Sequence, residues 1–322
     1  MWKSLPLLLV CCVAACSRPG TEERTGMTQQ PPQAPVPVAV PAFNAERAFG
    51  YLLTQTSFGP RNPNSPGHEA CKNYFITTLR ASADDLRLQE FTENGYNGEK
   101  LRLTNIIASF RPQDRERILL CAHWDTRPRA ERDEDPKKRD LPILGANDAA
   151  SGAAVLLELA SLLRATPPQI GVDIVLLDGE DYGKESDHHL YLLGSRYFAR
   201  TKPADYLPRF GILLDMVGDA QLEIPREMHS FRYAPDIVAM VWSTARELGI
   251  TQFVHENGDE ILDDHVPLNE AGIKTIDIID FNYPDQTHRY WYTHEDTPEH
   301  CSAESLGAVG TVVTHVVYKQ KK

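Results

Sequence analysis

The sequence predicts one α/β domain with three layers, in which helices cover both faces of a central twisted, mostly parallel mixed sheet. Apolar runs of strand length alternate along the chain with segments of helical period. Several of these runs, such as Ile118–Ala122, are apolar throughout, as expected of strands that are buried on both faces. A chain of 322 residues, 42% of them hydrophobic, is also long enough to bury one large core.

The elements are expected in an order typical of a layered α/β domain. The strand candidates include Leu101–Phe110, Arg117–Ala122, Val172–Leu177, Phe210–Leu214, Gln252–His255 and Lys274–Ile279. The helix candidates are Asn44–Thr56, Gly67–Ser82, Ala149–Ala165, Tyr191–Thr201, Pro235–Leu248 and Ala303–Tyr318.

Charge and cysteine content exclude two kinds of protein. The chain has 33 Lys and Arg against 45 Asp and Glu, a formal net charge of −12, whereas a nucleic-acid binder needs a basic face to neutralise phosphates. We therefore expect no nucleic-acid partner. The six cysteines match no disulfide framework or metal cluster. Cys121 lies in an apolar run and is expected to be a small buried hydrophobe.

The N-terminus predicts export. The apolar run Leu5–Ala15 is too short to span a bilayer as a finished helix but has the length of a signal-peptide core. It leads into Val13-Ala14-Ala15-Cys16, which resembles the lipobox of bacterial lipoproteins, in which the cysteine is lipidated. We expect residues 1–15 to be a signal peptide and Cys16 to anchor the protein to a bacterial membrane. Because Ser17 follows, the outer membrane or periplasmic face is favoured. A plain secretory signal is the alternative.

Residues 16–41 differ in composition from the rest of the chain. They contain the run Pro-Pro-Gln-Ala-Pro-Val-Pro-Val with polar flanks, which is typical of a semi-extended spacer. Residues 42–322 are expected to form a single catalytic domain.

Polar side chains gather where the apolar strands end. His123 and Asp125 follow one strand, Asp178–Asp181 follow another and Asp215 follows a third, while Asp148 precedes a helix. Ligands bind at the carboxyl ends of strands in open α/β sheets, and clustered carboxylates repel one another unless a cation or protons intervene. Carboxylate and imidazole ligands suit zinc. Each residue alone has a plainer interpretation: Asp148 as a helix N-cap and His123 as a core histidine.

Five motifs in order resemble those of the zinc aminopeptidase family that includes the glutaminyl cyclases, and the similarity extends from about Thr54 to Val317. The motifs are His123-x-Asp125, Asn147-Asp148-x-x-Ser151-Gly152, Asp178-Gly179-Glu180-Asp181, Leu214-Asp215-Met216-Val217-Gly218 and Asp263-Asp264-His265.

The resemblance implies a role for each polar group. Asp148 and Asp181 would be zinc ligands, and Glu180 would be the proton shuttle beside the metal. His123 and Asp215 would complete a second metal site with Asp148 in a two-zinc aminopeptidase. One zinc ion is expected in a cyclase and two in an aminopeptidase.

The finer features favour a cyclase. Asp263-Asp264-His265-Val266-Pro267 resembles the cyclase version, whose first aspartate joins a hydrogen-bond network with the residue at Asp215. The expected reaction is cyclisation of an N-terminal glutamine of a peptide or protein to pyroglutamate, with release of ammonia. Asp215 and Asp263 would orient the amine, and the enzyme is expected to be a monomer. The alternatives are an aminopeptidase and a lipid-anchored binding homologue with impaired catalysis.

One residue departs from the family pattern. The last zinc ligand of the family is a histidine in a Trp-His-Thr-x-x-Asp context, but here the stretch reads Trp291-Tyr292-Thr293-His294-Glu295-Asp296. Tyr292 therefore holds the ligand position, although a phenol with a reference pKa of about 10 is a poor ligand unless the metal lowers that value. His294 is the next candidate, and His288 is a more distant one. We expect Tyr292 to lie near the metal.

Overall fold

The computed structural model describes residues 11–12, 14, 39–185 and 187–322. The described residues from Ala39 onward form one compact unit. Cys16 and nearly all of the expected signal peptide and linker lie outside the described residues, so these expectations stay predictions. Within the described part, no helix has the length and apolar character needed to cross a membrane.

A six-stranded mixed sheet forms the middle of the domain. Its strands are β1 (Asp85–Asn94), β2 (Lys100–Phe110), β4 (Gly171–Leu177), β3 (Arg117–His123), β5 (Gly211–Asp215) and β8 (Thr275–Ile279), in that spatial order. The strands β4, β3, β5 and β8 are parallel, whereas β1 and β2 pair antiparallel at one edge. The predicted fold class is thus confirmed.

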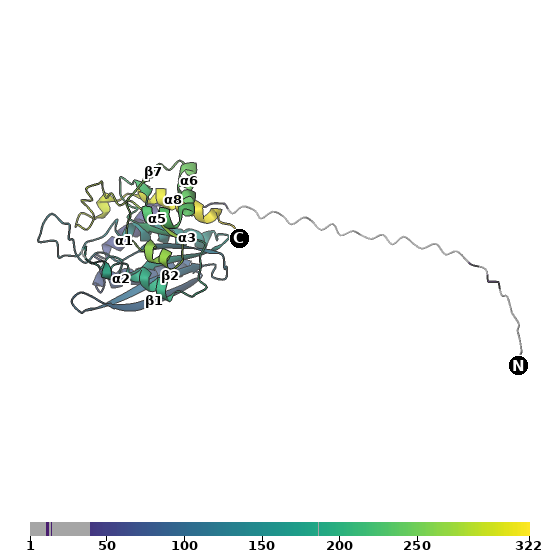
Figure 1. Cartoon of the computed structure of the whole chain (residues 1–322), viewed down its shortest axis with the longest axis horizontal. Helices are drawn as coiled ribbons and strands as arrows, with labels where there is room; N and C mark the ends of the chain where they lie inside the picture. The colour runs from purple at the N-terminus through teal and green to yellow at the C-terminus, as the bar shows by residue number, and fades with distance from the viewer. Residues whose placement is uncertain (1–10, 13, 15–38, 186) are drawn as a thin grey trace, which may run out of the picture. The chain divides into compact units, whose positions relative to one another are not determined.

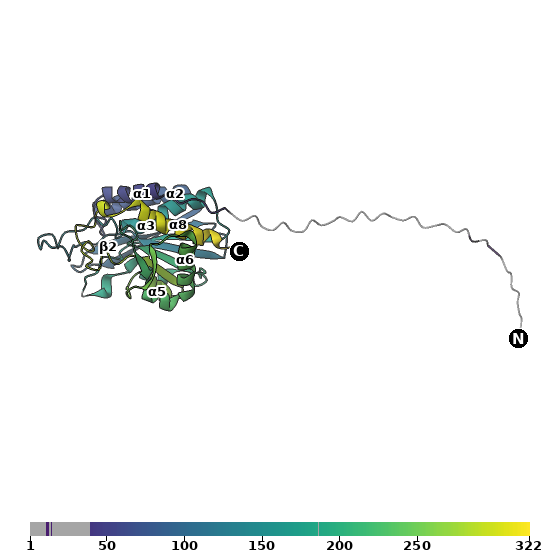
Figure 2. The same ribbon diagram turned by 90° about the horizontal axis from the view of Figure 1, so that it is seen from above.

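Eight α-helices belong to the described residues. They are α1 (Ala45–Ser57), α2 (Pro66–Ser82), α3 (Ala150–Ala165), α4 (Leu193–Thr201), α5 (Met228–Tyr233), α6 (Pro235–Leu248), α7 (His265–Glu270) and α8 (Ala303–Lys319). Figure 2 shows α1 and α2 along one side of the domain, with α3 and α8 close to them.

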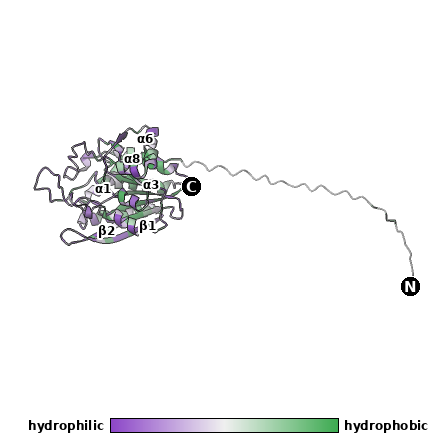
Figure 3. Cartoon of the chain, viewed as in Figure 1, coloured by the Kyte–Doolittle hydropathy of each residue, from purple (hydrophilic) through white to green (hydrophobic). Residues whose placement is uncertain are grey.

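The alternation of strand side chains explains why helices cover both faces. In β3, Leu120 belongs to a large core shared with α1, α2, α3 and α8. Its neighbours Leu119 and Cys121 point the other way, into a smaller core with Phe198 of α4 and Leu268 of α7. Both faces of the strand are apolar because both are buried, which gives the three layers (Figure 1). Hydrophobic residues accordingly concentrate in the interior of the domain (Figure 3).

Three parts of the fold differ from the expectation or were missed. The edge strand β1 was not predicted, because most of its residues are exposed or half-buried and it carries few apolar side chains. The strand expected at Gln252–His255 exists as β7 (Phe253–Asn257), but it pairs with β6 (Ile224–Arg226) outside the main sheet. The helices α5 and α7 have six residues each, too few to show a helical period in the sequence.

Helix α3 approaches the sheet unusually closely at Gly152. A Cβ atom at this position would lie 2.1 Å from the carbonyl oxygen of Leu214 and 3.1 Å from the Cβ of Ala122. Leu214 and Ala122 directly precede Asp215 and His123 in their strands. The first turn of α3 therefore packs on the ends of β5 and β3.

Candidate metal centre and catalytic site

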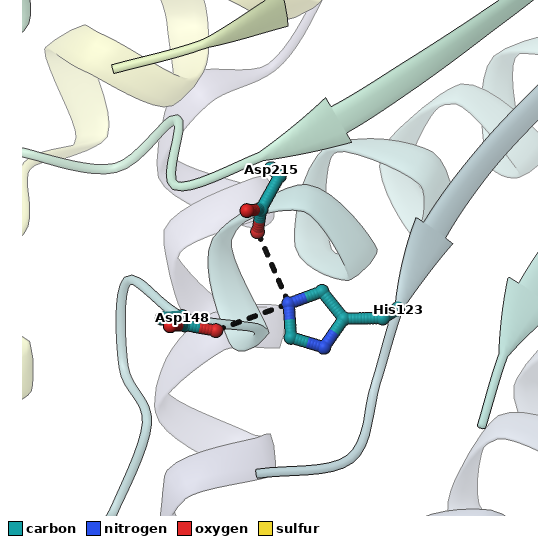
Figure 4. A group of neighbouring side chains, drawn as sticks. All are labelled: His123, Asp148 and Asp215. Atoms are coloured by element: carbon teal, nitrogen blue, oxygen red, sulfur yellow. Dashed lines mark hydrogen bonds and ion pairs between the residues drawn. The ribbon is translucent and has the colours of Figure 1, made fainter. Parts of the chain in front are cut away.

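Three buried side chains converge where β3 and β5 end and α3 begins (Figure 4). The Nε2 of His123 lies 3.0 Å from Oδ1 of Asp148 and 3.1 Å from Oδ1 of Asp215. Ligand atoms of the three residues all lie within 4.8 Å of one another. The N-cap interpretation of Asp148 is therefore wrong, because its side chain does not cap α3. His123 is buried, as a core histidine would be, but it faces two carboxylates.

The loop before α3 is held from two sides. The Asp296 carboxylate accepts hydrogen bonds from the backbone N–H groups of Asn147 at 2.8 Å and Asp148 at 3.2 Å. The Ser151 hydroxyl donates to the Asn147 carbonyl and accepts from the N–H of Val217. These bonds fix the Asp148 loop both to the segment after β5 and to the segment around Asp296.

Asp125 positions the proposed proton shuttle. Its carboxylate accepts hydrogen bonds from three successive backbone amides, those of Gly179 at 2.8 Å, Glu180 at 3.0 Å and Asp181 at 3.3 Å. The turn after β4 is thereby fixed, and Glu180 Oε2 lies 3.9 Å from Nδ1 of His123. Burial, followed by the charge of Asp181, raises the pKa of Glu180 well above its usual value. A carboxyl group with a raised pKa can accept and return a proton near neutral pH.

Asp181 is held by a buried arginine. Arg127 Nη1 donates to Oδ1 of Asp181 at 3.1 Å and to its carbonyl oxygen at 3.1 Å. Burial and the charge of Asp148 nevertheless outweigh this pairing and raise the pKa of Asp181 to about 8. Its second oxygen, Oδ2, is buried and has no hydrogen-bond partner in the described part of the chain.

Tyr292 and His294 lie in different surroundings. The Tyr292 ring is buried, and the Cζ of Arg127 lies 3.7 Å from the ring centroid. Burial raises the pKa of Tyr292 well above its usual value, which keeps the phenol protonated without a bound cation. His294 Nδ1 instead lies 2.9 Å from Oδ2 of Asp133, which also accepts the His294 N–H. The more distant candidate, His288, has its Nδ1 2.7 Å from the Phe281 carbonyl oxygen.

Asp263 is a buried carboxyl group in the neighbourhood of Asp215. Burial, and then the charge of Asp215, raises the pKa of Asp263 well above its usual range. The predicted residues Glu180, Asp215 and Asp263 thus surround one small region.

A cavity of about 640 Å³ opens beside this region. Glu180 lies in its wall, together with the aromatic side chains of Tyr191, Trp291 and Tyr292.

The donor set fits zinc. One imidazole nitrogen and two carboxylate oxygens are ligands that zinc takes in proteins. His123 Nε2 carries at most one proton, which cannot serve both Asp148 and Asp215, so a shared cation would satisfy both. The unpartnered Oδ2 of Asp181 is a further ligand atom of the same kind.

Sequence reasoning missed two residues that shape the site. Arg127 stands two residues after the His123-x-Asp125 motif, where an arginine in a polar loop is normally at the surface. Asp296 was recognised only as part of the motif around Tyr292, and its contact with Asp148 spans 148 residues.

The fold and the site define a class of hydrolase-like metalloenzymes. Residues 105–317 match peptidase family M28, and the chain belongs to that family.

Solved structures of the same fold include both a glutaminyl cyclase and an aminopeptidase precursor. The glutaminyl cyclase of Bacteroides thetaiotaomicron, bound to N-acetylhistamine, is 42% identical, with a TM-score of 0.84 over 88% of this chain and 100% of that one. A leucine aminopeptidase precursor from Bacteroides thetaiotaomicron VPI-5482 is 43% identical, with the same TM-score and coverage.

More distant relatives also include both aminopeptidases and glutaminyl cyclases. Aminopeptidase YwaD of Bacillus subtilis is 29% identical over 231 residues, which are 68% of this chain but 45% of YwaD, so the chain spans less than half of that relative. The glutaminyl-peptide cyclotransferase of Bos taurus is 22% identical over 79% of this chain and 76% of its own length. The chain is therefore an enzyme of a zinc-dependent family, either a glutaminyl cyclase or an aminopeptidase.

Proposed function

We propose that this enzyme cyclises N-terminal glutamine of peptides and proteins to pyroglutamate. The observation that carries the proposal is Asp263, a second buried carboxyl group in the neighbourhood of Asp215. This second carboxyl group provides an acceptor for a substrate amine. Hydrolysis by a metal-activated water has no need of such a group.

In the reaction, the α-amine of the glutamine attacks its own side-chain amide carbon, a C–N bond forms, and ammonia leaves. Glu180, which lies in the cavity wall, takes a proton from the attacking amine and returns it to the departing nitrogen. Asp215 and Asp263 hold the amine in line. Zinc bound by Asp148 and Asp181, with a third donor from the segment around Tyr292, would polarise the amide carbonyl and would leave Asp215 free for the amine. The aromatic wall excludes water, which would otherwise compete as the nucleophile.

An aminopeptidase is the second candidate, and a specific observation favours it. His123, Asp148 and Asp215 already form one ligand group, and the free Oδ2 of Asp181 offers part of a second. Two metal ions would suit hydrolysis with water as the nucleophile.

The test is to incubate the purified, zinc-saturated protein with a Gln-peptide and a Leu-peptide of otherwise identical sequence. Release of ammonia from the Gln-peptide with one zinc ion per chain supports the cyclase. Release of free leucine with two zinc ions per chain favours the aminopeptidase. Glu180→Gln is the control for contaminating activity, because it should remove either reaction while the fold persists. A zinc-saturated protein that binds peptides but releases neither product would instead be a binding homologue.

We also infer, from Val13–Cys16, that the protein works outside the cytoplasm on a lipid anchor. Its substrates would then be the N-termini of exported peptides and proteins, and we expect a monomer.

A further inference from the structure

The cavity beside the site differs between its floor and its mouth. Its floor consists of the buried lining residues Glu180, Tyr191 and Tyr292, each at most 9% exposed. Its mouth consists of the exposed lining residues, which are Arg132, Glu185, His188, Asp259, Glu260 and Leu262. The proposed reaction takes place at the floor, so the mouth is left for the part of the substrate that does not react.

The part of a peptide that passes the mouth follows from the reaction. Both the α-amine and the side chain of the N-terminal glutamine must reach Glu180. The rest of the peptide is joined to that glutamine through its carbonyl group and must leave through the mouth. An extended chain rises about 3.3 Å per residue, so the second and third residues are the first to pass it. The volume of about 640 Å³ is in the range of pockets that hold ligands larger than one residue.

Two of the three carboxylates at the mouth already have a cationic partner. Arg132 Nε lies 2.6 Å from Oε1 of Glu185. The two oxygens of Glu260 accept hydrogen bonds from the guanidinium of Arg232 at 2.9 and 3.0 Å. The opposite charges of each pair largely cancel for a side chain of the substrate that comes near them.

Asp259 is the third carboxylate, and it has no such partner. Its side chain is exposed and takes part in no ion pair or hydrogen bond within the described part of the chain. Its backbone is nevertheless held, because its carbonyl oxygen accepts from the N–H of Met228 at 3.0 Å. Two residues further on, the N–H of Ile261 donates to Glu227 at 3.0 Å. Asp259 therefore presents an uncompensated negative charge at a fixed place on the mouth.

We propose that Asp259 is a specificity residue that favours substrates with lysine or arginine as the second or third residue. A cationic side chain at these positions meets an unpaired carboxylate, whereas an acidic side chain is repelled. The substrate class is then peptides and proteins in which a basic residue closely follows the N-terminal glutamine. The identity of the first residue rests on the proposed function, whereas the preference for a basic residue after it does not.

The size of the preference follows from the exposure of Asp259. An exposed ion pair changes a binding constant by about two- to fivefold. Attraction of a Gln-Lys peptide and repulsion of a Gln-Glu peptide act together, so their kcat/KM values should differ by about five- to tenfold. The difference should lie in KM, because Asp259 contacts a part of the substrate that does not react. It should shrink in 0.5 M salt, which screens exposed charges.

The substitution Asp259→Asn tests the residue, and Asp205→Asn is the matched control. Asp205 is also exposed and without an ion pair in the described residues, but it lies between α4 and β5, before the end of β5 that is remote from the site. Each substitution removes one negative charge, so an effect of net charge is the same in both. Asp259→Asn should lower the Lys-to-Glu ratio of kcat/KM about fivefold, and Asp205→Asn should leave it within about twofold.

Arg132→Met tests the charge balance of the mouth from the other side. It leaves Glu185 without its cation and so adds a second uncompensated carboxylate. The Lys-to-Glu ratio should then rise about two- to fivefold. A ratio that stays the same or falls overturns the electrostatic account of the mouth.

Two results for the aspartate variants would overturn the proposal. If Asp259→Asn and Asp205→Asn change the ratio equally, net charge and not Asp259 sets the preference. If the zinc-saturated wild type treats the two peptides alike, the mouth does not select by charge.

Calorimetric binding of the same two peptides separates this proposal from the proposed function. The dissociation constants of the zinc-saturated Glu180→Gln variant, with and without Asp259→Asn, should show the same preference and the same loss. Equal dissociation constants for the two peptides in Glu180→Gln overturn the role of Asp259. If the wild type converts no Gln-peptide, the proposed function fails, and the dissociation constants still decide whether Asp259 selects a basic residue.

Discussion

Substitution of Arg127 should show how much this side chain stabilises the buried carboxylate of Asp181 when no metal is bound. The guanidinium is completely buried, donates twice to Asp181 and twice to Glu131, and lies against the ring of Tyr292. Arg127→Met keeps much of the volume but leaves Asp181, which is fully buried, without its cation. Loss of one partner of a buried pair costs about 3–5 kcal/mol of unfolding free energy. We expect about 4 kcal/mol for the zinc-free protein above pH 8, where Asp181, whose pKa is about 8, is ionised.

Arg132→Met is the matched control for Arg127→Met. Arg132 also pairs with a glutamate, Glu185 at 2.6 Å, and also lies over an aromatic ring, with its Cζ 4.2 Å from the centroid of Trp291. Its side chain is 42% exposed, so its removal should cost only about 0–1 kcal/mol.

The assay is urea unfolding of both variants and the wild type, first with a chelator and then with excess zinc. If Arg127→Met costs no more than Arg132→Met without zinc, Asp181 does not depend on the guanidinium and the reasoning is refuted. With zinc, the cost should become smaller, because the metal replaces the missing cation at Asp181. A cost that zinc leaves unchanged would argue against Asp181 as a ligand.

Three further experiments test the lipid anchor, the proton shuttle and the last zinc ligand. Cys16→Ser should release the protein from membranes or block its processing; fractionation would contradict the lipid anchor if the variant stays in the membrane at its wild-type mature mass. Glu180→Gln should keep the fold and most of the zinc but lower turnover by about 10²–10⁴-fold, and near-normal turnover of zinc-saturated variant would reject the shuttle. Tyr292→His should raise zinc affinity by about 10–100-fold in titrations against a competing chelator, whereas His294→Ala should matter less. If His294→Ala strips the metal and Tyr292→Phe leaves it untouched, His294 is the ligand.

The strands of the sheet and the site residues at their ends were predictable, because each is indicated by a short stretch of sequence. The largely apolar runs of β3, β4 and β5 predicted the buried strands, and the polar residues at the ends of β3 and β5 predicted His123 and Asp215 as site residues. Parallel strands end at the same edge of the sheet, so their convergence followed from sequence order alone.

The residues that hold the site in place were harder to predict, because their partners are remote in sequence. Asp296 reaches Asp148 across 148 residues, and no local pattern records that contact. Arg127 is a charged residue in a loop position that a sequence alone would assign to solvent, and its burial depends on the packed tertiary structure.

The absence of a side chain at Gly152 has a consequence for how such a centre can change over time. Helix α3 contacts the carbonyl of Leu214 and the methyl group of Ala122, and this contact sets the distance of Asp148 from Asp215 and His123. The spacing of these three ligands therefore depends on a contact at the backbone of α3. A ligand can be replaced on such a scaffold without a change in the other distances, because these distances do not depend on the ligands themselves. A methyl group at position 152 would instead push α3, and with it Asp148, away from the ends of β5 and β3. The identity of a metal ligand can therefore change during evolution, whereas the distances between the ligands stay fixed as long as α3 packs on β3 and β5 in the same way.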